Sequence, residues 1–128
     1  MKIKTSELEG AALNWAVAKA AYPESFQDGC ALRVREVIDG EGITIGCVYF
    51  GGRHGLFRKF SPSTDWSQAG PLIAEHKVLF DTDDWSIIWA TAGNSNISKG
   101  GDSHLIAACR AIVAAKLGDD VDVLEDLA

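Results

Sequence analysis

The sequence has no excess of positive charge, no close pair of cysteines and no apolar run long enough to span a membrane. Its 128 residues include 12 Lys and Arg against 18 Asp and Glu, a formal net charge of −6. Because nucleic-acid surfaces need clustered positive charge, nucleic acid is not an expected partner. The cysteines Cys30, Cys47 and Cys109 are widely separated, which favours a reducing compartment. With no apolar signal segment after Met1–Lys4, the expected location is the cytoplasm, without membrane association.

Motifs for common cofactors and reactions are also missing. His54, His76 and His104 form no close pair with one another or with the cysteines, so we expect no metal site. No P-loop, nucleophile elbow or other catalytic signature is present, and we expect neither a cofactor nor an enzyme activity. The glycine-rich polar loops 51–55 and 93–101 are interpreted as turns. The alternative interpretation is that either loop binds an anion.

The expected fold class is α+β, in one domain over residues 1–128. A Ser6–Glu9 capping box opens a predicted helix over 6–21, and a second long helix is expected over 103–117, ended by Gly118. Between them, alternation and turn residues predict an antiparallel sheet built from 31–38, 43–50, 56–60 and 85–91. The two helices, plus a short kinked one, should pack on this sheet as a small sandwich.

Acidic residues are concentrated in the last segment of the chain, 119–128. We expect this tail to be partly ordered, because its apolar residues can pack against the rest of the protein, and frayed at its end. A chain without it should still fold. The five carboxylates, which account for most of the net charge, are Asp119, Asp120, Asp122, Glu125 and Asp126.

The helix over 103–117 is too apolar to lie half in water. Ala107, Ala111 and Ala114 share one face, and small side chains permit close approach of a neighbouring backbone. The first helix could cover part of this row and a second subunit the remainder, so we expect a homo-oligomer, most simply a homodimer.

The stretch SPSTDWSQAGP, residues 61–71, reads chiefly as the start of a helix. Ser63 or Thr64 should be the N-cap and Asp65 a first-turn acid, with Trp66 anchored in the core. A kink or restart is expected at Gly70–Pro71.

The same stretch supplies candidate binding residues, together with two residues elsewhere. Tryptophans such as Trp66 and Trp89 serve either as core anchors or as a stacking surface for a base. Arg110 lies within an apolar row, where it either snorkels or pairs with a carboxylate such as Asp65. The candidate binding set is Ser63, Thr64, Asp65, Trp66, Trp89 and Arg110.

Three motifs resemble the phage NinX-like family, small proteins of unknown function from lambdoid phages and prophages. They cover a little under half of the chain: MKIKTSELEGAALNWAVAKA, FSPSTDWSQAGPLI and LIAACRAIVAAKLGDDVDVLEDL. The chain departs from the family pattern at Asn14, usually Asp, at Ala69, usually Gly, and at Cys109, usually Met. The later motifs are also similar to small phage α/β/α-sandwich domains. The resemblance implies a phage origin and helices packed on a sheet, but no reaction.

These observations favour a phage accessory protein that acts by non-catalytic binding to a host or phage protein. The alternative is a module that binds a small ligand or nucleotide, for example one that sequesters a host defence signal.

Overall fold

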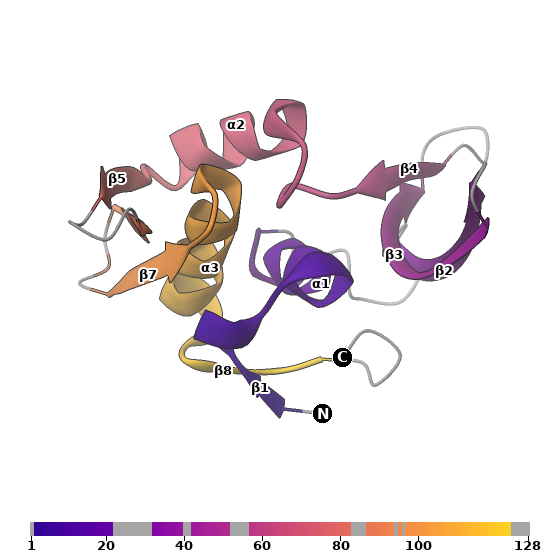
Figure 1. Cartoon of the computed structure of the whole chain (residues 1–128), viewed down its shortest axis with the longest axis horizontal. Helices are drawn as coiled ribbons and strands as arrows, with labels where there is room; N and C mark the ends of the chain where they lie inside the picture. Colours follow the sequence, from indigo (N-terminus) through magenta and orange to yellow (C-terminus); the bar gives the residue numbers. More distant parts are fainter. Residues whose placement is uncertain are drawn as a thin grey trace.

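The structure, a computed structural model, describes residues 2–21, 32–39, 42–51, 57–82, 87–93, 95 and 97–123. It confirms an α+β fold in which the described strands pair antiparallel. Two helices, α1 (Gly10–Ala21) and α3 (His104–Leu117), pack against each other at the centre (Figure 1). A third, α2 (Trp66–Glu75), packs beside α3. No helix in these ranges is long and apolar enough to cross a membrane.

One sheet contains the three consecutive strands that the sequence predicts. Its order is β2 (Leu32–Asp39), β3 (Gly42–Gly51) and β4 (Phe57–Phe60), all antiparallel. The pairing expected between 31–38 and 43–50 is confirmed, with Leu32 opposite Phe50. Its register shifts between Arg35 and Val37, where Glu36 interrupts the apolar alternation of the sequence. Figure 1 shows this sheet beyond α1, on the side away from α3.

A separate sheet contains β5 (Leu79–Thr82), β6 (Ile88–Thr91) and β7 (Ser98–Gly101) in that order. The prediction that 85–91 joins the first three strands in one sheet is therefore wrong. The polar loop predicted over 93–101 is also not all loop, since it includes β7. The alternating pattern predicted β6 as a strand. Packing determines which strands it pairs with, because buried Ala90 and partly buried Ile88 belong to the same core as α3.

The two ends of the described chain meet in a third, two-stranded sheet. In it β1 (Lys2–Lys4) pairs with β8 (Asp120–Asp122), and the Thr5 hydroxyl donates to the Gly118 carbonyl at 2.6 Å. These contacts hold residues 5–7 in a 3₁₀ helix, η1 (Thr5–Glu7), so α1 begins only at Gly10. The capping box predicted at Ser6 is wrong, because contacts with β8 and Gly118, more than 100 residues away, determine the conformation of this segment.

The acidic tail is ordered as far as the structure describes it. Val121 and Val123 are buried and belong to the central core. Residues 124–128, where fraying is expected, lie outside the described ranges. A chain that ends before Val121 would lose core contacts, so we now expect deletion of 119–128 to destabilise the fold.

The ends of α3 agree with the sequence. Ser103 is the N-cap, and its Oγ accepts from the Ile106 N–H at 3.1 Å. Gly118 follows the helix with a φ of 89°, a conformation that favours glycine.

The apolar faces of α3 are buried within one chain. The predicted row of Ala107, Ala111 and Ala114 is almost wholly inaccessible, and it is covered by elements of the same chain. No second subunit is needed to cover this row, which removes the argument for a dimer interface at α3.

Candidate functional site

Asp65 is the N-cap of α2, one residue later than the sequence predicts. Its Oδ1 accepts from the Ser67 N–H at 2.9 Å and from the Ser67 hydroxyl at 2.6 Å. These bonds favour the carboxylate and hold the pKa of Asp65 below its usual value. The predicted cap at Ser63 or Thr64 is wrong, since the Thr64 hydroxyl makes only long contacts, at 3.4 Å, with Ser61, and the Ser63 hydroxyl has no hydrogen-bond partner among the described residues. The predicted restart at Gly70–Pro71 is also not seen, because α2 continues through Pro71.

Ser63 attaches the segment before α2 to the core. Its N–H donates to Oδ1 of Asn14, a buried residue of α1, at 3.0 Å. The Ser63 side chain is only 4% exposed, and its Oγ has no hydrogen-bond partner among the described residues. The Ser63 backbone therefore has a structural role, whereas the Ser63 hydroxyl is buried without a hydrogen-bond partner among the described residues.

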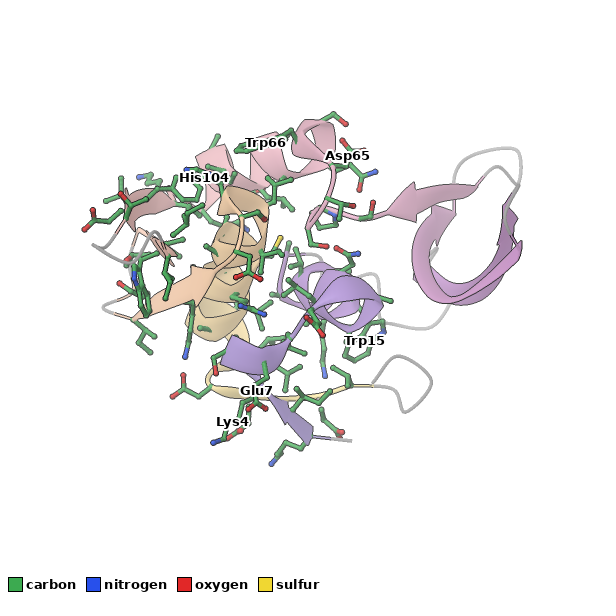
Figure 2. The ribbon with its side chains drawn as sticks, viewed as in Figure 1. Lys4, Glu7, Trp15, Asp65, Trp66 and His104 are labelled. Carbon is green, nitrogen blue, oxygen red and sulfur yellow. The ribbon has the colours of Figure 1, made fainter. Side chains whose placement is uncertain are left out.

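Trp66 lies on the surface and does not anchor α2 in the core, so this prediction is wrong. It is 59% exposed, and its ring centroid lies 6.3 Å from that of His104, at the start of α3. The His104 ring in turn meets Phe80 of β5 edge-on, with centroids 5.2 Å apart. Three aromatic side chains from α2, α3 and β5 thus form a row at one end of the molecule, where Figure 2 labels Trp66 and His104.

A shallow pocket of about 550 Å³ lies beside this aromatic row. Three of the six candidate residues line it: Ser63, Thr64 and Trp66. The start of α3 supplies most of the remaining wall. Asp65 is not among the lining residues.

Trp89 and Arg110, the two other candidates, line a different pocket of about 380 Å³. The Arg110 Nε donates to the Leu8 carbonyl at 2.9 Å, and Nη1 donates to the Gly100 carbonyl at the same distance. The guanidinium thus joins the end of η1 to β7. Of the two roles predicted for Arg110, pairing with Asp65 is wrong. Asp102 lines both pockets, so the two lie next to each other.

The structure does not assemble a nucleophile from these residues. Asp65 bonds Ser67, and neither the Ser63 hydroxyl nor the buried His76 Nε2 has a hydrogen-bond partner among the described residues, so Ser63, Asp65 and His76 form no triad. Cys109 is buried in the core, and burial raises the pKa of its thiol to about 12. In the described ranges no group of three potential ligands is placed to hold a metal ion.

Parts of the predicted candidates lie outside the described residues, namely 52–55 of the first polar loop and positions 94 and 96 of the second. Sequence reasoning also missed three surface residues: Leu79, Phe80 and His104. A short apolar run such as VLF predicts a strand, but it gives no sign that the strand will form an exposed edge.

The model of a family described as Bacteriophage P22, NinX, matches residues 4–116 of the chain. No curated protein matches the chain.

Proposed function

The chain belongs to the Bacteriophage P22 NinX family, and we propose that this phage accessory protein acts by non-catalytic binding to a host or phage protein. The proposed place of action is the host cytoplasm. The proposed contact surface, which we call the β5 surface, is the exposed edge of β5, with Leu79 on one face of the sheet and Phe80, His104 and Trp66 on the other.

Exposure of β5 is the observation that supports this proposal. All four residues of the strand are exposed, and β5 is an edge strand, since among the described strands it pairs with β6 alone. Leu79 is 71% exposed and Phe80 is 37% exposed. Large apolar side chains at a sheet edge are a hazard for a protein without a partner, since they invite association.

The aromatic row extends the apolar surface from β5 to α2. Aromatic residues are enriched where interfaces concentrate their binding energy. Covering the side chains of Leu79 and Phe80 would contribute about 2 kcal/mol each before the costs of association. At the sheet edge itself, Asp81 Oδ1 accepts from the Thr82 N–H at 2.9 Å, which leaves one fewer backbone donor for a partner strand. Side-chain contacts are therefore the favoured mode of docking.

A matched pair of charge substitutions tests the proposal. Leu79→Lys places an ammonium on the exposed edge strand β5, whereas Glu7→Lys places one on η1, at the opposite end of the molecule from Trp66 and His104 (Figure 2). Both positions are exposed, so both variants should keep the stability of the parent within about 0.5 kcal/mol.

The readout is co-purification of a defined phage or host protein from infected cells, followed by reconstitution with the purified partner. We expect Leu79→Lys to weaken the reconstituted complex at least about tenfold and Glu7→Lys to leave it unchanged. Equal affinity of both variants would contradict the proposal.

A second copy of the chain is the other partner to test. If the protein is a homodimer, we expect the β5 surface to form the interface, because the α3 row is already covered. Light scattering on the parent and on Leu79→Lys then reports a dimer and a monomer, respectively. A dimer that persists in Leu79→Lys would exclude the β5 surface as its interface.

A further inference from the structure

We propose that the pocket lined by Arg110 and Trp89 binds a small organic molecule that combines a flat ring with a single negative charge. The site is distinct from the β5 surface, and it needs no protein partner. The Arg110 pocket is formed by η1, β6, β7 and α3, and its lining includes Ser6, Trp89, Lys99, Gly100, Asp102 and Arg110.

Arg110 provides a positioned positive charge. Two of its five N–H groups are used by the carbonyls of Leu8 and Gly100, which fix the plane of the guanidinium. No carboxylate of the described residues lies within salt-bridge distance of Arg110, although the side chain is partly buried. A partly buried guanidinium without an acidic partner favours an anion as ligand, because the remaining N–H groups suit a planar carboxylate or a phosphodiester.

Lys99 does not supply a second free charge. Its side chain is 15% exposed, and its Nζ lies 3.1 Å from Oδ1 of Asp119, which forms an ion pair with it. Asp102, exposed at the rim of the pocket, adds a negative charge. The charges that face the pocket therefore favour a ligand with one negative charge over a ligand with two.

The wall of the pocket favours a flat ring. Trp89 and Ile87 lie over Gly100, where a Cβ atom would stand 3.3 Å from Trp89 Cζ3 and 3.2 Å from Ile87 Cγ2. The missing side chain at Gly100 leaves the indole edge as part of the lining. Indole faces and edges bind aromatic rings well, and the volume of about 380 Å³ is that of an ordinary small-ligand site.

Nuclear magnetic resonance titration of the ¹⁵N-labelled full chain tests this proposal. The two sources of the required chemistry are represented by 3′,5′-cyclic AMP, a phosphodiester, and indole-3-propionate, an aromatic carboxylate. Adenosine, which has the ring but no charge, and AMP, which is a dianion near pH 7.5, are the controls.

We expect saturable shifts of the Lys99–Asp102 amides and of the Arg110 Nε–H with at least one of the two monoanions. Adenosine and AMP should bind at least about tenfold more weakly. The monoanion that binds more tightly identifies the source of the ligand. The proposal is overturned if neither monoanion binds at about 5 mM, or if adenosine binds as tightly as the monoanions.

Two variants and a control then localise the site. Arg110→Lys keeps the charge but loses the planar fork, and we expect it to weaken binding about tenfold. Trp89→Leu removes the ring and should weaken binding about fivefold without touching the guanidinium, which keeps the test valid if Arg110→Lys does not fold. Trp66→Leu, in the neighbouring pocket, should bind as the parent does. Unchanged affinity in Trp89→Leu would overturn the proposal.

Discussion

Single residues decide where the helices of this protein begin. Ser103 and Asp65 both cap a helix through a side-chain oxygen, and the segment before α2 offered three consecutive residues of capping type, Ser63, Thr64 and Asp65. Local chemistry predicts that one of them caps α2, but it does not decide which. The attachment of the Ser63 N–H to Asn14, 49 residues away, is part of what decides it.

Removing the N-cap hydroxyl of Ser103 should lower the free energy of unfolding more than removing the Thr64 hydroxyl, which caps no helix. Ser103→Ala loses the acceptor for the Ile106 N–H, and we expect the free energy of unfolding to fall by about 1 kcal/mol. Thr64→Ala, which removes only contacts of 3.4 Å, should change it by less than about 0.5 kcal/mol. Urea denaturation of the two variants measures both values, and a larger loss in Thr64→Ala would restore the cap predicted from the sequence.

His76 makes stability depend on pH. Its Nε2 is buried without a hydrogen-bond partner among the described residues, and burial lowers the pKa of the imidazole below 6.5. Lys116 lowers this pKa further, whereas Glu75 opposes the shift. Because the unfolded chain then takes up the proton first, stability should be lost as the pH falls below about 6.5.

The titration of His76 can be followed directly by the chemical shifts of its imidazole. We expect a midpoint below that of an unfolded peptide, and we expect His76→Gln to lose less stability than the parent between about pH 7 and pH 5. A midpoint at or above the peptide value would contradict this account.

At the scale of elements, close packing of β7 on α3 depends on a glycine. A Cβ at Gly101 would stand 2.7 Å from the Ala107 nitrogen and 2.9 Å from Ile106 Cγ2, too close for either to remain in place. We expect Gly101→Ala to lower the free energy of unfolding by about 1–3 kcal/mol. Gly70 is the matched control, because a Cβ there meets nothing within 4 Å and the residue lies inside α2.

Gly70→Ala should therefore stabilise the protein by about 0.5–1 kcal/mol through helix propensity. Thermal denaturation of the two alanine variants should shift in opposite directions. A shift in the same direction would show that α3 and β7 are not packed as closely as described.

The β1–β8 pair is an element that the sequence could not predict. Val121 is buried between acidic neighbours, and its partner strand lies at the other end of the chain. Val121→Ala should cost about 2 kcal/mol, whereas Asp120→Ala, at an exposed position, should cost less than about 0.5 kcal/mol. Equal stability of the two variants in urea would contradict the assignment of the tail to the core.

At the scale of the whole molecule, the sequence predicts what is local and misses what is long-range. Caps, turns and alternation indicated α3, the β2–β3 hairpin and β6 as separate elements. They could not assign β6 to a second sheet or place Ser6 in a 3₁₀ helix, because both depend on contacts between distant segments. Five of the six candidate binding residues divide between two pockets for the same reason, and Asp65 lines neither.

The central claim is that the β5 surface binds a protein, and site-specific photocrosslinking tests it most directly. A benzophenone amino acid is placed at Leu79 in one variant and at Glu7 in another, and both are irradiated in infected cells. The account predicts a discrete crosslinked product, of one defined mass, from position 79 and none from position 7. No product from position 79, or the same product from both positions, would contradict it.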